Sequence, residues 1–90
     1  MEKYLPIGTL VLLKNANKRI MIIGFYVTSN NDNKVYDYVG CLYPEGLLSS
    51  DQSLVFNHDQ IDKILHLGII DDEEKEFKKK LNELVLKENK

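Results

Sequence analysis

The pattern of apolar and polar positions divides the chain into a β-rich first part and a helical last part. The short polar break at 15–18 joins the first two apolar runs as a β-hairpin. Gly24 interrupts the second run, which predicts a bulge or a sharp bend of the kind that closes small barrels. Apolar runs rich in β-branched and aromatic residues predict strands at 9–14, 19–27, 34–43 and 53–56.

Two helices are predicted in the rest of the chain. Asn57 is a suitable N-cap and Gln60 stands at the capping-box position, which predicts a short helix over 58–67 that ends at Gly68. A second helix is predicted over 72–88.

The second helix has both a start signal and an apolar stripe. Asp71 and Glu74 form another capping-box pattern, with acidic residues in the first turn as the helix dipole prefers. The stripe follows the spacing i, i+4, i+7, i+8 and consists of Phe77, Leu81, Leu84 and Val85. It could pack on the sheet of its own chain, form a homodimer, or dock in a groove of a partner.

Together these elements predict one α+β domain over residues 1–90, mainly β over 1–56 and mainly helical over 57–90. The expected architecture is a small bent antiparallel sheet of about four or five strands, or a partly open SH3-like barrel. The two helices follow it.

Charge and hydropathy exclude several classes of partner. The net charge is −2, whereas nucleic-acid binding normally requires a basic surface. No apolar run is long enough to cross a bilayer, and the first residues lack the pattern of a secretory signal. We therefore expect a cytoplasmic protein without membrane insertion. The alternative, a regulatory nucleic-acid-binding small β-barrel, requires four cations to converge beside tyrosines that stack on bases: Lys14, Lys18, Arg19 and Lys34.

Residues with metal-binding or nucleophilic chemistry are few. His58 and His66 lie about 12 Å apart if both are on one helix, which is too far to share an ion. One Cys and two His do not supply the four ligands of a structural zinc site. Cys41 falls inside a predicted strand, where a free Cys usually acts as a small buried apolar residue. No metal and no cofactor are expected.

The alternative that the protein is an enzyme depends on two carboxylates. Asp37 and Glu45 stand in aromatic surroundings, and an acid pair in an apolar cleft can act as general acid and base. That chemistry would need a deep pocket converging on one of them. An isolated Asp in a strand more often faces solvent or accepts a hydrogen bond from a backbone amide, so we expect no enzymatic activity.

The most suggestive surface residues are tyrosines. Tyr36, Tyr38 and Tyr43 fall within a short stretch that continues into Pro44 and Glu45. Tyr is enriched in binding hot spots because it buries a large area and keeps a polar group. These five residues are the predicted protein-binding surface, and the exposed side of the last helix is a second candidate. The alternative is that the rings cover the core of a small sheet.

Three segments, 4–14, 18–24 and 37–46, resemble a family of small bacterial proteins known as domain of unknown function 4176. The segment from Tyr43 to Gly46 is the most distinctive part. Members of that family occur in Gram-positive bacteria, often encoded near type VII (Esx) secretion genes and LXG toxins. The resemblance implies a cytoplasmic accessory factor or chaperone that binds a secreted toxin before export. It supplies no catalytic or metal-binding residue.

Overall fold

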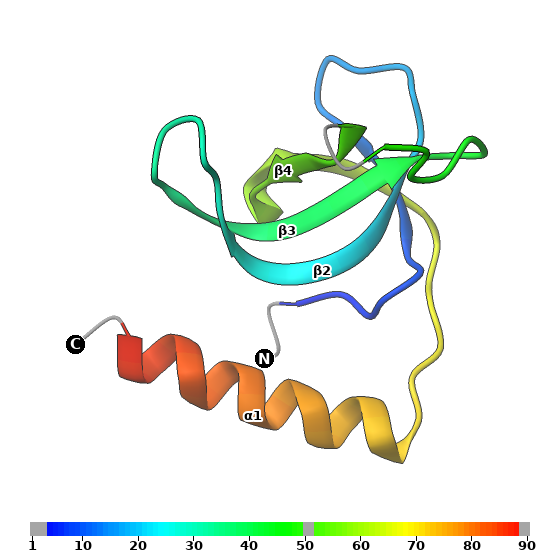
Figure 1. The fold of residues 1–90 in the computed structure, drawn as a ribbon. Helices are drawn as coiled ribbons and strands as arrows, with labels where there is room; N and C mark the ends of the chain where they lie inside the picture. Colours follow the sequence, from blue (N-terminus) through cyan, green and yellow to red (C-terminus); the bar gives the residue numbers. More distant parts are fainter. Residues whose placement is uncertain (1–3, 50–51, 89–90) are drawn as a thin grey trace.

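The computed structural model describes residues 4–49 and 52–88, and its fold class is the predicted α+β. Five strands form one antiparallel sheet in the order β4-β3-β2-β1-β5, and a helix follows the sheet along the chain (Figure 1). The sheet is bent but open, since β4 and β5 form its two edges. The elements are β1 Leu10–Leu13, β2 Ile20–Thr28, β3 Val35–Leu42, β4 Leu54–Phe56, a 3-10 turn His58–Gln60, β5 Ile61–His66 and α1 Asp72–Glu88.

The bend in β2 occurs where the sequence predicts it. The register between β2 and β3 shifts between Ile22 and Gly24, which confirms the bulge. A Cβ atom at Gly24 would lie 2.6 Å from Cγ1 of Val39, so the two strands approach too closely there for any side chain. Both strands curve strongly through this region (Figure 1).

The predicted helix over 58–67 is wrong. The capping interaction does form, because Gln60 Oε1 accepts a hydrogen bond from the Asn57 N–H at 2.7 Å, but the turn ends at Gln60. Residues 61–66 instead pair with β1 as the edge strand β5. An isolated helix of that length is marginal in water, whereas β1 offers backbone partners at four positions. The β-rich part of the chain therefore extends to His66, and not to residue 56.

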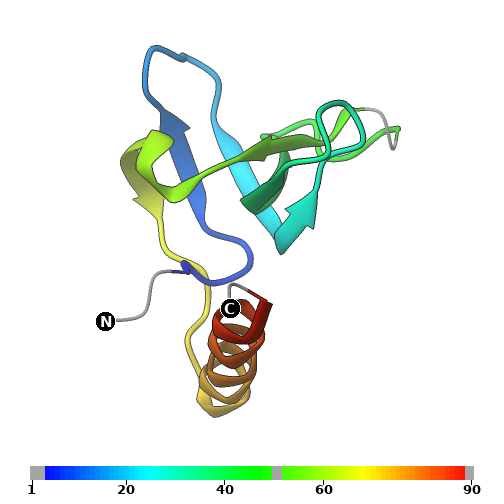
Figure 2. The ribbon, with the colours of Figure 1, turned by 90° about the vertical axis from the view of Figure 1, so that its left-hand side faces the viewer.

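Helix α1 begins as predicted. Asp71 Oδ1 accepts a hydrogen bond from the Glu74 N–H at 2.9 Å, which is an N-cap interaction. In Figure 2 the helix is seen end-on below the bent sheet. Leu81 packs into the core, but Phe77 and Leu84 of the predicted stripe are about half exposed. Lys78 is buried in their place, with only 2% of its surface exposed.

The core is aromatic at its centre. Tyr38 is fully buried, and its ring centroid lies 5.3 Å from that of Phe56 and 5.8 Å from that of Tyr4. Such edge and tilted contacts add to the stability gained by burying the rings. The buried apolar cluster consists of Tyr4, Val11, Ile20, Ile22, Tyr38, Phe56 and Leu81.

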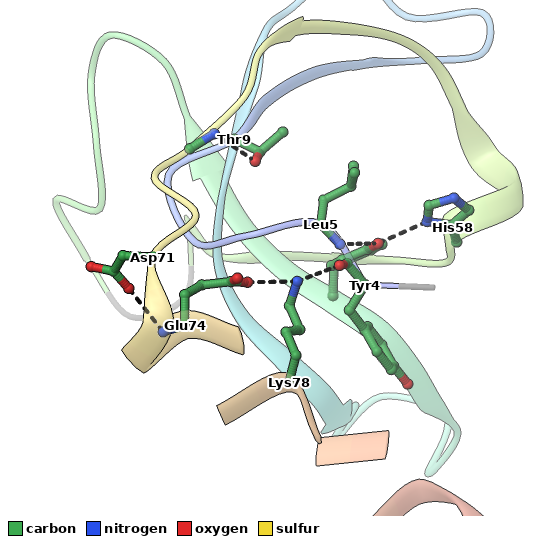
Figure 3. A network of polar contacts seen from close by, with 9 residues as sticks. Tyr4, Leu5, Thr9, His58, Asp71, Glu74 and Lys78 are labelled. Carbon is green, nitrogen blue, oxygen red and sulfur yellow. Dashed lines mark hydrogen bonds and ion pairs between the residues drawn. The ribbon is translucent and has the colours of Figure 1, made fainter. Parts of the chain in front are cut away.

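The segment at Tyr4 and Leu5 passes between α1 and the sheet and is held on both sides (Figures 1 and 3). On the helix side, Lys78 Nζ donates a hydrogen bond to the carbonyl oxygen of Tyr4. On the sheet side, the Leu5 N–H donates to Tyr38 Oη at 3.0 Å, and Tyr38 Oη lies 2.7 Å from His58 Nδ1. All three groups are satisfied when the Tyr38 hydroxyl donates its proton to His58 Nδ1. The N-terminal segment thus joins the helix to the sheet.

Burial gives Tyr38 an unusual titration. Loss of hydration raises the pKa of Tyr38 from 10.0 to about 12, against the lowering effect of the hydrogen bond from Leu5. Because the pKa of the folded chain lies above that of the unfolded chain, this hydroxyl contributes stability that is complete below pH 10.0 and is lost as the pH rises toward about 12. In an alkaline titration followed by tyrosinate absorbance, we expect Tyr38→Phe to remove a step near pH 12. Loss of a step near pH 10.0 instead would contradict this assignment.

Candidate protein-binding surfaces

The structure does not bring the predicted tyrosines together on one surface. Tyr38 lies in the core under Tyr4 and Phe25, so its prediction as a contact residue is wrong. Tyr36 lies at the start of β3, where its hydroxyl donates to Asp32 Oδ2 at 2.6 Å. Tyr43 lies beyond the other end of the same strand. The accessible rings of Tyr36 and Tyr43 are therefore separated by the length of β3.

Tyr43, Pro44 and Glu45 do form an exposed corner. Arg19 Cζ lies 4.8 Å from the centre of the Tyr43 ring, and Lys18 Nζ lies 2.7 Å from Glu45 Oε1. The Lys18 ammonium lowers the pKa of Glu45. Both charged groups are nearly half exposed, so the ion pair contributes little stability, and its side chains are available to a partner.

The four cations of the nucleic-acid alternative do not gather beside the tyrosines. Lys18 and Arg19 lie at Tyr43, and the Lys18 ammonium is paired with a carboxylate. Lys34 lies at the opposite end of the β2–β3 hairpin, where its carbonyl accepts from the Ser29 N–H. No basic surface with interleaved aromatic rings is assembled by these four residues.

The two carboxylates of the enzyme alternative are also apart. Asp37 Oδ2 accepts from the His58 N–H at 2.8 Å, and the Asp37 N–H donates to Asn57 Oδ1 at 3.1 Å. Asp37 thus holds the 3-10 turn against β3, beside a hollow of about 430 Å³. Glu45 lies at the Tyr43 corner. Across residues 4–49 and 52–88, no group of three or more His, Cys, Asp or Glu could hold a metal ion.

One apolar feature absent from the sequence prediction lies on the edge strand β5 and the residue directly after it. Ile64, Leu65 and Leu67 are between 47% and 51% exposed, and we call these three residues the β5 strip. They belong to the segment that the sequence predicts to be a helix over 58–67. Exposed apolar residues on an unpaired strand edge mark a binding site or an aggregation hazard.

A second apolar feature lies between α1 and the curved part of β2. Two adjoining hollows of about 460 Å³ and 490 Å³ share Ile7 and Phe77 in their walls, and we call them together the α1 trough. Its sheet wall includes Tyr26, whose φ of 51° is rare for a residue other than glycine. The other lining residues are Ile23, Gly24, Phe25, Ile69, Asp71, Glu73, Glu74, Lys80, Leu81 and Leu84.

Comparison with known proteins identifies one family. The model of the family described as Domain of unknown function (DUF4176) matches residues 4–77. No curated protein and no solved structure matches the chain. Within the part of the chain that the structure describes, no helix is both long and apolar enough to span a membrane. The matched residues include the whole β5 strip and the Tyr43 corner, whereas most of α1 lies beyond them.

Proposed function

The chain belongs to the DUF4176 family, and we propose that it is a non-catalytic module that binds another protein through the β5 strip. The observation that carries the proposal is the exposure of three large apolar residues close together in the chain, Ile64 and Leu65 on the edge strand β5 and Leu67 directly after it. Burying each such side chain in an interface is favourable by about 1–2 kcal/mol, since half of each is already covered.

The backbone of β5 also favours a protein partner. An edge strand presents one row of unpaired N–H and C=O groups, which an extended segment of a partner can satisfy. The regular part of β5 consists of the pairs of Val11 with Ile64 and Leu12 with Lys63, and a register shift flanks it on each side. A partner strand would therefore contact a short regular stretch, with the apolar side chains of the strip supplying most of the affinity.

The family context suggests what that partner is. We infer that the module acts in the cytoplasm as an accessory factor or chaperone for a toxin exported by a type VII system. A segment of the toxin that is not yet folded would supply the extended, apolar chain that the β5 strip fits. The corner of Tyr43, Pro44 and Glu45 lies in the matched residues and is the second contact region of this proposal.

The proposal is tested by affinity capture from the native cytoplasm of the organism, washed at high salt and analysed by mass spectrometry. Apolar contacts survive such a wash, whereas contacts to phosphates do not. We expect the wild type to retain one stoichiometric secreted toxin. The double variant Ile64→Ser/Leu65→Ser should retain at least about tenfold less of it.

The matched control is Leu86→Ser. Leu86 is 67% exposed on α1 and lines neither hollow of the α1 trough, so this variant should capture as much toxin as the wild type. Tyr43→Ala measures the contribution of the corner in the same experiment. Equal capture by all variants, retention of nucleic acid alone that salt removes, or no retained protein would overturn the proposal.

A further inference from the structure

One row of side chains on α1 lies at the border between the sheet and open solvent. Glu73, Phe77, Lys80 and Leu84 follow the spacing i, i+4, i+7, i+11, which places them in one row along the helix. All four line the α1 trough, and Phe77 and Leu84 are about half exposed. The residues that face the core belong to a neighbouring row. Phe77 contacts the ring of Phe25 at a centroid distance of 5.8 Å, but about half of its surface stays exposed.

When two copies of this row run in opposite directions, the residues that face each other are complementary. Phe77 stands near the middle, with Glu73 one turn before it and Lys80 one turn after it. Apolar residues stand at both ends, Leu84 in the helix and Ile70 just before it. When two copies of the row run antiparallel about a two-fold axis at Phe77, each Glu73 faces the Lys80 of the other copy. Each Leu84 then faces an Ile70.

We propose that the occupant of the α1 trough is a second copy of this chain, with the two α1 helices antiparallel. The interface of the dimer would consist of the same patch on both copies, as in most homodimers. The two Phe77 rings would meet on the axis, and two Glu73–Lys80 pairs would flank them. A parallel arrangement would place Glu73 against Glu73 and Lys80 against Lys80, so the charges select the antiparallel one.

Two further features fit a helix as the occupant. In the antiparallel arrangement the dipoles of the two helices point in opposite directions, which is favourable. The sheet wall at Ile23 and Tyr26 stands opposite the row, so the second helix would have apolar surface on two sides. The homodimer uses residues of α1 and not the β5 strip, so it is separate from the function proposed for that strip.

The test is charge reversal on the full chain, with the dimer dissociation constant measured by analytical ultracentrifugation over a concentration series. We expect Glu73→Lys alone and Lys80→Glu alone each to weaken the dimer about tenfold or more, because each places two like-charge pairs in the interface. An equimolar mixture of the two variants should associate as tightly as the wild type, since both contacts of the mixed dimer then join opposite charges. Misfolded variants would not recover in this way.

Glu76→Lys and Lys79→Glu are the matched controls, because these two side chains do not line the trough. Both should dimerise like the wild type, and so should Ile64→Ser/Leu65→Ser. A wild-type chain that is monomeric throughout the series overturns the inference. Single reversals without effect, or a mixture that fails to associate, overturn it as well.

Discussion

Lys78→Ala is expected to lower the free energy of unfolding by about 3–5 kcal/mol, because it removes one partner of a buried ion pair. Lys78 Nζ lies 2.7 Å from Glu74 Oε2 and also donates to the carbonyl of Tyr4 (Figure 3). Without the cation, the largely buried Glu74 carboxylate and the Tyr4 carbonyl both lose that partner. A domain of this size has a total stability of about 5–15 kcal/mol, so the loss is a large share of it.

Two companion variants separate the charge from the packing of the side chain. Lys78→Met keeps most of the stem volume but still leaves the Glu74 charge without its cation, so we expect a smaller but clear loss. Adding Glu74→Gln to Lys78→Met removes the stranded charge and should recover part of the stability. Lys75→Ala, an exposed position on the same helix, is the control and should change stability by no more than about 0.5 kcal/mol. Urea unfolding of the four variants measures these differences. A Lys78→Ala variant as stable as the control would show that the buried pair contributes nothing.

Gly68→Ala is expected to be about as damaging, for a steric reason. A Cβ atom at Gly68 would lie 2.1 Å from the carbonyl oxygen of Ile7 and 3.2 Å from the backbone nitrogen of Thr9. These are backbone atoms, so the segment at Ile7 and the segment after β5 must move apart. The hydrogen bond from the Gly68 N–H to Oγ1 of the buried Thr9, at 3.0 Å, would be strained with them. We expect a loss at or above the upper end of the roughly 1–3 kcal/mol seen for overpacked positions.

Gly46→Ala is the matched control for this substitution. Gly46 has a φ of 77°, but nothing lies within 4 Å of a Cβ atom built there. Its cost is therefore conformational only, about 1 kcal/mol. The two variants are compared by urea unfolding under the same conditions. An equal loss for both would mean that the close approach of the two segments is relieved without cost, contrary to the expectation.

The sequence predicts those features whose signals are local. The bulge at Gly24, the N-cap at Asp71 and the first four strands each depend on residues within a few positions of one another. The helix over 58–67 failed although its cap at Asn57 is real. Whether that turn continues as a helix depends on β1, which lies far away in the sequence and competes for the same backbone groups.

The candidate surfaces were harder to predict, because burial depends on contacts between distant segments. Glu74 and Lys78 have the spacing of an ordinary solvent-exposed pair, and only the position of Tyr4 shows that the lysine is buried. Tyr38 looks like a contact residue in sequence and is the centre of the core in the structure. The β5 strip was missed because the sequence predicts a helix over 58–67 and gives no sign of an exposed edge strand there. Tyr43, Pro44 and Glu45 lie in an exposed turn, and a turn with Pro and Gly is a local signal in the sequence; their role in binding stays a prediction.

The hydrogen bond between Lys78 and Tyr4 joins residues 74 positions apart, and this spacing has a consequence for synthesis. Tyr4 is synthesised 74 residues before Lys78, so this hydrogen bond forms only after that part of α1 has been made. Leu81, which completes the aromatic core, is made later still. The nascent chain therefore displays its strands with an unfinished core until Leu81 has been made. The synthesis of α1 is consequently the step that allows this domain to complete its fold.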